Sequence, residues 1–219
     1  MSRINRKGIL LDLDGTLLDT APDMVASLGA ICKKLDIQAP DYDFARAYVS
    51  MGAAGLLRAA LPYLDEGEIA ELIPAYLDIY AANLANDTVL FEGMAELLEQ
   101  LEASDILWGV VTNKPAYLTD PLLKALRLYD RSACVISGDT IPHRKPEPEP
   151  LLLGMQHAGL APANTLYVGD AERDIQAGRN AGMTTVAAEY GYILPEENPA
   201  DWQANYHIAH PSELLELIN

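Results

Sequence analysis

Apolar residues recur every three or four positions through residues 20–85, the spacing expected of helices that bury one face. The first of these helices should begin with Thr20 as its N-cap and Asp23 three residues later, and should end before Pro40. No stretch of this block alternates in the way a strand does. We therefore predict only helices here, at 20–38, 44–49, 55–61 and 66–85, the last kinked near Pro74.

Short apolar strand patterns alternate with helical stripes in the rest of the chain. A first strand is predicted at 9–13, where Asp12 interrupts the apolar run. Alternation of this kind favours an α/β fold with a doubly wound parallel sheet, similar to a Rossmann fold, and right-handed crossovers. The other strands are expected at 106–111, 133–136, 165–168, 184–187 and 206–209, and helices at 94–101, 116–127, 148–158, 174–181 and 211–218.

The connection after the first strand is far longer than this fold needs. Strand-to-helix loops in such sheets usually have about 2–6 residues, whereas here the core helical stripe resumes only near residue 92. The helical block is therefore predicted to be a small domain inserted after the first strand. We expect a catalytic core formed by 1–17 and 88–219 and an all-helical cap domain formed by 18–87.

Composition and charge narrow the class of protein. The chain has 219 residues, of which 50% are hydrophobic and 21% charged, as in globular proteins. Thirty-two acidic against fifteen basic residues give a net charge of −17, which disfavours binding to nucleic acid or to anionic membranes. Cys32 and Cys134 match no zinc or redox spacing, and no signal peptide or membrane-spanning run is apparent. We expect a cytoplasmic protein that acts on a small molecule.

Polar residues follow three of the predicted strands. Asp12 and Asp14 come at the end of the first, Thr112 and Asn113 after the second, and Asp170 after the fourth, with Asp174 four residues further on. Because ligands bind at the carboxyl ends of strands in open parallel sheets, these groups should converge.

An aspartate after a strand is often only a helix cap, and this alternative is strong for Asp170. Asp12 is harder to dismiss, since a buried carboxylate is costly unless it is paired or bound to metal. Clustered carboxylates without a nearby histidine favour a hard cation, and we expect Mg²⁺. Lys145 is either a solvated loop lysine or the cation that holds a phosphate beside this cluster. The four histidines fit no zinc spacing, and there is no G-x-S-x-G elbow.

Together these motifs resemble those of the haloacid dehalogenase-like superfamily. The resemblance rests on DLDGTLLDT at 12–20, VVTNK at 110–114, the Lys145 loop and GDAERD at 169–174, and it runs over essentially the whole chain. Within the superfamily the chain is similar to the phosphoglycolate phosphatase group, and its segment 189–202 is similar to phosphatases of N-acetylmuramate 6-phosphate. One departure is Val49-Ser50-Met51-Gly52, where the group often has V-G-x-G.

The resemblance implies a Mg²⁺-dependent phosphomonoesterase that forms an aspartyl-phosphate on Asp12. It implies that Asp14 protonates the leaving oxygen and then deprotonates water. The metal would be held by the Asp12 carboxylate, the Asp14 backbone carbonyl and Asp170, with Asp174 supporting the metal or Lys145. Thr112 and Lys145 would act in catalysis, and Thr16 and Asn113 would contact the substrate. The substrate is expected to be 2-phosphoglycolate, or alternatively N-acetylmuramate 6-phosphate or another sugar phosphate.

Selectivity should come from the helical block, because the core motifs contact only the phosphoryl group. We expect Ser50, Met51 and Gly52 to reach the substrate and Arg58 to bind its carboxylate; the alternative is that Ser50 caps the next helix and Arg58 is solvated. A dehalogenase would not need Asp14, a phosphomutase would keep every motif residue, and a phospho-receiver module would lack the cap. We expect a monomer or weak homodimer.

Overall fold

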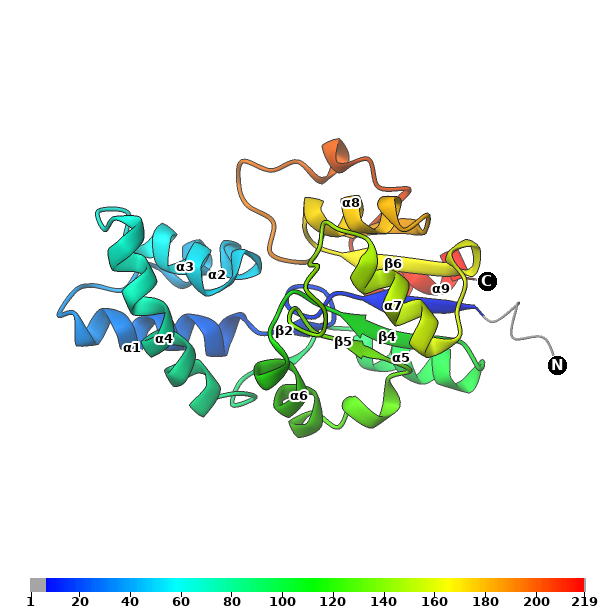
Figure 1. Cartoon of the computed structure of the whole chain (residues 1–219), viewed down its shortest axis with the longest axis horizontal. Helices are drawn as coiled ribbons and strands as arrows, with labels where there is room; N and C mark the ends of the chain where they lie inside the picture. The colour runs from blue at the N-terminus through cyan, green and yellow to red at the C-terminus, as the bar shows by residue number, and fades with distance from the viewer. Residues whose placement is uncertain (1–6, 219) are drawn as a thin grey trace.

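Six parallel strands form the central sheet of the computed structural model, which describes residues 7–218 (Figure 1). The strand order is β5-β4-β1-β6-β7-β8, so β1 lies between β4 and β6. The chain builds outward from β1 on one side and then returns to build outward on the other, which confirms the doubly wound topology. The strands are β1 (Gly8–Leu11), β4 (Leu107–Val111), β5 (Val135–Ile136), β6 (Thr165–Gly169), β7 (Thr184–Ala188) and β8 (Tyr206–Ile208).

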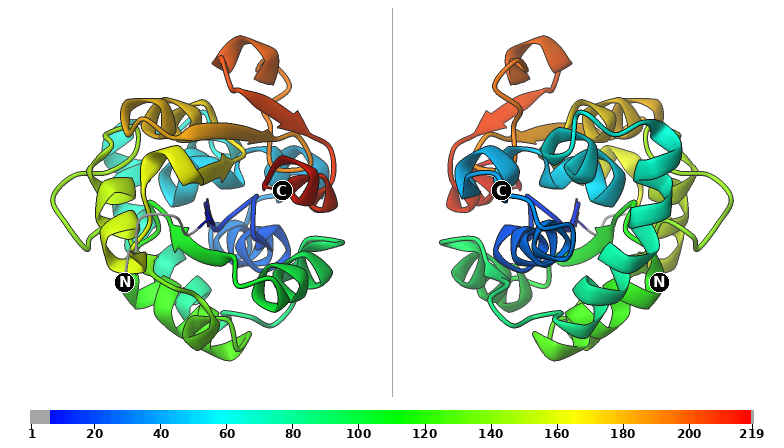
Figure 2. Two further views of the ribbon diagram at one scale, coloured as in Figure 1. Left: turned by 90° about the vertical axis from the view of Figure 1, so that its right-hand side faces the viewer. Right: turned by 90° about the vertical axis from the view of Figure 1, so that its left-hand side faces the viewer.

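Helices cover both faces of the sheet (Figure 2). Side chains alternate along β1, so that Ile9 and Leu11 belong to one apolar cluster and Leu10 to the other. The first cluster includes residues of α5 (Met94–Ala103), α6 (Ala116–Ala125) and α9 (Leu214–Ile218). The second includes residues of α7 (Glu149–Ala158) and α8 (Glu172–Asn180). This layered packing leaves the carboxyl ends of the strands as the edge at which polar groups can meet.

Four helices within residues 21–82 form the helical insertion, which lies at one end of the molecule (Figure 1). They share one apolar cluster that also takes in Leu118 of α6 and Tyr192 of the loop after β7. A two-stranded antiparallel ladder, β2 (Leu18–Asp19) with β3 (Val89–Leu90), joins the two segments that lead into and out of the insertion. The helices are α1 (Ala21–Lys34), α2 (Tyr42–Ala47), α3 (Gly52–Ala60) and α4 (Glu66–Ala82).

Several element boundaries differ from those expected from the sequence. Thr20 does precede α1, but its hydroxyl makes no capping bond and instead donates to Asp14 Oδ1 at 2.7 Å. The two short helices of the insertion begin earlier than predicted, and the final predicted helix begins as a 3₁₀ turn. Short 3₁₀ segments are η2 (Val49–Met51), η3 (Tyr129–Arg131), η4 (Pro162–Asn164), η5 (Pro199–Trp202) and η6 (Pro211–Glu213).

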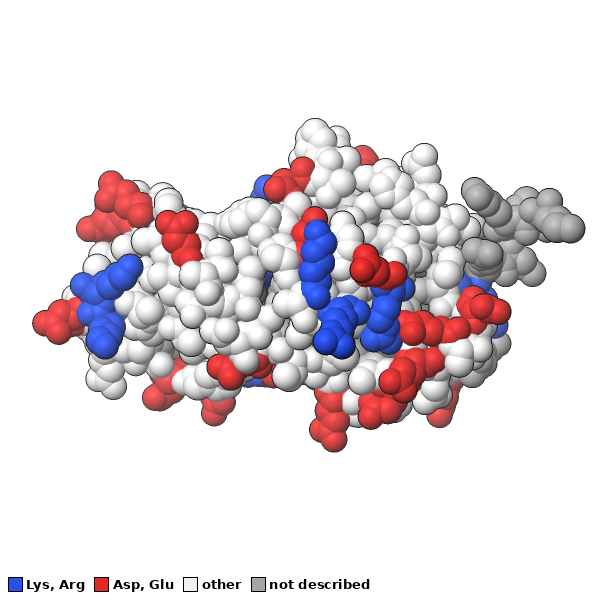
Figure 3. All heavy atoms as spheres, turned by 90° about the horizontal axis from the view of Figure 1, so that it is seen from below, with Lys and Arg blue, Asp and Glu red and all other residues white. Residues whose placement is uncertain are grey.

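Acidic side chains are scattered along the face of the molecule seen in Figure 3, as the net charge of −17 leads one to expect. Cys32 and Cys134 are both buried free thiols. Within residues 7–218 there is no helix whose length and apolar character would allow it to cross a membrane.

Candidate active site

Asp12 follows β1 directly and is buried, with 3% of its surface exposed. The strand ends at Leu11, two residues earlier than predicted, yet the Asp12 amide still donates to Val168 O at 2.9 Å, like a strand residue. The chain then turns, so Asp14 does not continue an extended strand beside Asp12. Gly15 permits this turn with φ of +84°, and a Cβ there would lie 2.0 Å from Asp170 Oδ2. The turn therefore requires glycine for its backbone angle and for its close approach to a second aspartate.

Asp170 and Asp174 are fully buried beside the carboxyl end of β6. Asp170 is not the helix cap, because Ala171 takes that position in α8. Its Oδ2 instead accepts hydrogen bonds from Ser50 Oγ at 2.6 Å and from the Tyr192 amide at 3.0 Å, and its Oδ1 accepts from Thr16 Oγ1 at 3.3 Å. Asp174, in the first turn of α8, accepts from the Ala171 amide at 3.1 Å. The Asp170 carboxylate thus joins the β1 turn, the helical insertion and the loop after β7.

Lys145 lies between the carboxylates of Asp12 and Asp174, and its side chain is wholly buried. Its Nζ is 2.8 Å from Asp12 Oδ1 and 2.7 Å from Asp174 Oδ1, and it also donates to Val111 O at 3.0 Å. The solvated alternative considered for this lysine is therefore wrong. Its backbone is held by the Asn113 side chain, which accepts from the Lys145 amide and donates to the Lys145 carbonyl, both at 3.0 Å. The Asn113 side chain thus fixes the Lys145 loop, and Asn113 also lines the cavity described below.

Asp12, Asp170 and Asp174 each place a carboxylate oxygen within 4.8 Å of the others. Burial, followed by the charges of Asp12 and Asp174, raises the pKa of Asp170 to about 7. Burial also raises the pKa of Asp174, and the Lys145 charge opposes that shift. Three buried carboxylates that offer only oxygen ligands fit a hard divalent cation such as Mg²⁺. The Asp14 side chain is not one of this group, so any metal contact of Asp14 would be through its backbone carbonyl.

The Asp14 carboxylate faces a lysine that the sequence analysis overlooked. Lys114 Nζ lies 2.8 Å from Asp14 Oδ1 and also donates to the Tyr80 hydroxyl of α4 at 2.8 Å. Lys114 follows Asn113 in the chain, and its amide donates to Thr112 Oγ1 at 3.1 Å. Its position at a strand end, beside two residues that were selected, was the signal that could have identified it.

A cavity of about 400 Å³ lies between these groups and the helical insertion. Ser50, Met51 and Gly52 line it, together with Asp12, Asp14, Thr112, Asn113 and Lys114. Apolar residues of α1, α3, α4 and α6 form much of its remaining wall, and Arg144 and Arg173 also line it. A larger hollow of about 770 Å³ lies at the opposite end of the sheet, near the amino ends of β1 and β4, away from all the motif residues.

Arg58 is not brought to this cavity. Its guanidinium donates to Glu66 at 2.7 and 2.6 Å on the exposed side of the insertion, and half of its side chain is exposed. The solvated alternative therefore describes Arg58, and the cations that line the cavity are Lys114, Arg144 and Arg173.

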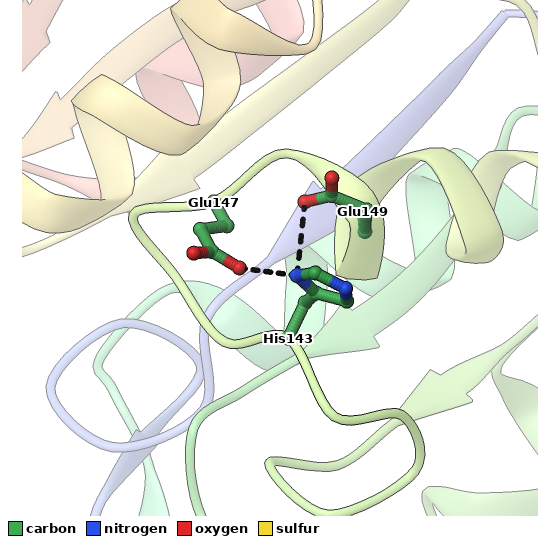
Figure 4. A group of neighbouring side chains, drawn as sticks. All are labelled: His143, Glu147 and Glu149. Carbon is green, nitrogen blue, oxygen red and sulfur yellow. Dashed lines mark hydrogen bonds and ion pairs between the residues drawn. The ribbon is translucent and has the colours of Figure 1, made fainter.

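A second group of possible ligands consists of His143 and Glu147, in the loop before α7, and Glu149, the first residue of that helix (Figure 4). His143 Nδ1 is hydrogen-bonded to a Glu147 carboxylate oxygen and lies 4.0 Å from Glu149 Oε2. The bond to Glu147 raises the pKa of His143. None of the three lines the 400 Å³ cavity, and His143 and Glu147 are exposed, which agrees with a surface ion pair.

Comparison with known proteins identifies one family over most of the chain. The family model for haloacid dehalogenase-like hydrolases matches residues 9–188. An N-acetylmuramic acid 6-phosphate phosphatase from Pseudomonas putida is 42% identical over 97% of this chain and 96% of its own, and a phosphoglycolate phosphatase from Xanthomonas campestris pv. campestris is 41% identical over 96% and 95%.

Among solved structures, one from Haemophilus somnus 129PT, described as a predicted phosphoglycolate phosphatase, superposes with a TM-score of 0.85 at 28% identity and covers the whole of both chains. The matched region includes each of the four motifs, from the Asp12 turn to Asp174. The chain belongs to the haloacid dehalogenase-like hydrolase family.

Proposed function

We propose that this protein hydrolyses a phosphate monoester with Asp12 as the nucleophile. The observation that carries the proposal is the position of Asp12: it is buried, 2.8 Å from Lys145 Nζ, and grouped with Asp170 and Asp174 within 4.8 Å. The Lys145 ammonium beside Asp12, together with the cation that the grouped carboxylates would hold, would supply the positive charge that the phosphoryl oxygens need when Asp12 attacks.

In the first step an Asp12 oxygen forms a bond to phosphorus while the bond to the leaving oxygen breaks, and Asp14 gives that oxygen a proton. In the second step a water molecule attacks the phosphorus of the aspartyl-phosphate and gives a proton to Asp14. The bond between phosphorus and the Asp12 oxygen breaks, which releases inorganic phosphate and restores the free Asp12 carboxylate. Lys145 stabilises the phosphoryl oxygens, and Asp174 holds Lys145 at 2.7 Å.

Mg²⁺ is the proposed cofactor. Asp12, Asp170 and the backbone carbonyl of Asp14 would hold it, and its charge would offset that of the phosphoryl oxygens. Asp174 already pairs with Lys145, so its proposed part is to position that lysine beside the ion.

The helical insertion, residues 18–87, is proposed to act as a cap that selects the substrate. Its residues Ser50, Met51 and Gly52 line the cavity together with the core groups, and Ser50 Oγ donates to Asp170 Oδ2 at 2.6 Å. Closing this unit over the site would exclude all water except the attacking molecule.

For the substrate we propose N-acetylmuramate 6-phosphate, which reverses the order expected from the sequence. Relatives of nearly equal identity carry both names, so similarity does not separate the two candidates. The cavity favours the sugar, because about 400 Å³ with an extensive apolar wall far exceeds what the two-carbon acid of 2-phosphoglycolate would fill. The positive charges of Arg144 and Arg173 would attract the phosphate and the lactyl carboxylate of N-acetylmuramate 6-phosphate.

The test is hydrolysis of a panel of phosphate monoesters by the wild type and by Asp12→Asn. We expect the wild type with Mg²⁺ to release phosphate fastest from N-acetylmuramate 6-phosphate, and Asp12→Asn to lose turnover by at least about 10³-fold. Asp130→Asn makes the same chemical change at an exposed position and serves as the control. Trapped phosphate that maps to any residue other than Asp12 would refute the assignment.

A further inference from the structure

The candidate active site contains two buried lysines, Lys114 and Lys145, and only Lys145 contacts the proposed nucleophile Asp12. Lys145 pairs with Asp12 and Asp174, whereas Lys114 pairs with Asp14. Because Asp14 is the proposed proton donor to the leaving oxygen, Lys114 lies on the leaving-group side of the reacting bond.

Lys114 connects three separate parts of the chain. It comes from the loop after β4, its Nζ donates to Asp14 in the β1 turn at 2.8 Å, and it donates to Tyr80 of α4 at the same distance. The ammonium also lies 4.6 Å from the centre of the Tyr80 ring. Only 6% of the Lys114 side chain and 17% of the Asp14 side chain are exposed, so this contact is shielded from water.

Both hydrogen bonds to the Asp14 carboxylate fall on one oxygen. Thr20 Oγ1 and Lys114 Nζ donate to Oδ1 at 2.7 and 2.8 Å, and within residues 7–218 no hydrogen bond is made to Oδ2. Two donors on one oxygen fix the plane of the carboxylate and leave the other oxygen for proton transfer.

Lys114 in turn depends on the helical insertion. A buried ammonium is costly unless its donors are paired, and its second partner, the Tyr80 hydroxyl, is on α4. If α4 withdraws from the core, Lys114 loses that partner and Asp14 loses its fixed orientation.

We propose that Lys114 is a positioning residue for the proton-transferring carboxylate Asp14, and that Tyr80 holds Lys114 in place only while α4 lies against the core. The inference rests on the proposed phosphomonoesterase function. If it is correct, Asp14 is oriented to protonate the leaving oxygen only when the helical insertion encloses the substrate.

The first test compares leaving groups. An alkyl phosphate, such as N-acetylmuramate 6-phosphate or 2-phosphoglycolate, needs a proton on its leaving oxygen, whereas the nitrophenolate of p-nitrophenyl phosphate leaves without one. Because kcat/KM reports steps up to departure of the leaving group, Lys114→Met should lower it on the order of 100-fold for whichever alkyl ester the wild type cleaves. The value for the aryl ester should fall less than about threefold, and Asp14→Asn should show the same imbalance more strongly.

The second test asks whether Tyr80 acts through Lys114. Tyr80→Phe keeps the ring and removes the hydroxyl, and should lower kcat/KM for the alkyl ester about tenfold in the wild type but less than about twofold in Lys114→Met. Tyr63→Phe is the control for the chemical change, because it removes the hydroxyl of an exposed tyrosine in the loop before α4 that does not line the cavity. That variant should leave the ratio of alkyl to aryl rates unchanged.

The outcomes separate the two proposals. If the wild type cleaves neither ester, the proposed function itself is wrong. If the wild type is active but Lys114→Met slows both esters by the same factor, or Tyr80→Phe has its full effect without Lys114, the positioning role is overturned and the phosphatase assignment stands. The melting temperature of each variant shows whether the fold persists. If Lys114→Met does not fold, the ratio of alkyl to aryl kcat/KM in Tyr80→Phe alone tests whether α4 acts on Asp14.

Discussion

The carboxylate of Asp23 in α1 holds Thr88, the residue at which the chain returns from the helical insertion to the sheet. Asp23 Oδ2 accepts from the Thr88 amide at 3.0 Å and from Thr88 Oγ1 at 2.6 Å, and its Oδ1 accepts from the Asp87 amide at 2.9 Å. Both Asp23 and Thr88 are buried. The sequence indicated Asp23 only as part of the start of a helix, three residues after the expected N-cap, yet it joins the start of the insertion to its end.

Removing this carboxylate should destabilise the fold. Asp23→Ala leaves three donors without their acceptor, and because hydrogen bonds to a charged group are worth about 1.5–3 kcal/mol each and do not add fully, we expect a loss of about 2–4 kcal/mol. Urea denaturation measures the change. Asp78→Ala, at an exposed position of α4, should stay within about 0.5 kcal/mol of the wild type. Equal urea midpoints for Asp23→Ala and the wild type would contradict the prediction.

Stabilisation by Mg²⁺ should grow as the pH rises. The pKa of Asp170 in the metal-free fold is raised to about 7 from 3.8, so the folded state binds a proton that the unfolded state releases. The metal-free fold therefore loses stability as the pH rises from about 4 to about 7, and a bound cation relieves that loss. The difference in melting temperature between Mg²⁺ and EDTA should widen from pH 5 to pH 8. Asp170→Asn should remove this widening, and a constant difference in the wild type would argue against metal binding at Asp170.

Lys145 should contribute mainly to the rate of the chemical step. Its contacts with Asp12 and Asp174 place its charge where the phosphoryl oxygens gain charge in the transition state. Lys145→Met should therefore lower kcat by about 10²–10³-fold, instead of only raising KM. Lys124→Met changes an exposed lysine in the same way and should keep the wild-type kcat. An unchanged kcat for Lys145→Met would return this lysine to a structural role.

Much of the fold could be predicted because buried strands and helix faces require apolar residues at regular spacings along the sequence. β1, β4 and β6 are apolar runs covered on both faces, and the long helical stripe before β4 revealed the insertion. Boundaries were less predictable where side chains serve distant partners. Thr20 has the residue type and position of an N-cap, but its hydroxyl bonds to Asp14, and no local pattern reports that choice.

The grouping of Asp12 and Asp170 could be predicted, because both follow strands of one parallel sheet, whereas for Lys145, in the long loop after β5, the sequence left two alternatives open. The site was not predictable where position depends on how the insertion packs. Lys114 could have been selected from its position after β4, but its contact with Tyr80 depends on how α4 packs and has no local mark in the sequence. Arg58 was assigned by charge alone, and its nearest acidic partner in the folded chain turned out to be Glu66, eight residues away.

Substrate ranking should depend on Met51 and not on Arg58. Met51 lines the cavity from the helical insertion, and we propose that the sugar of N-acetylmuramate 6-phosphate would lie against it, whereas 2-phosphoglycolate, which has only two carbons, would leave most of the cavity unfilled. Met51→Ala should therefore lower kcat/KM for the sugar phosphate about tenfold while changing that for 2-phosphoglycolate by less than about twofold. Arg58→Ala should leave the ranking unchanged, because the Arg58 guanidinium is exposed and paired with Glu66. A competition assay with both substrates in one mixture measures the ratio directly. A shift caused by Arg58→Ala, with none from Met51→Ala, would mean that the leaving group does not occupy this cavity.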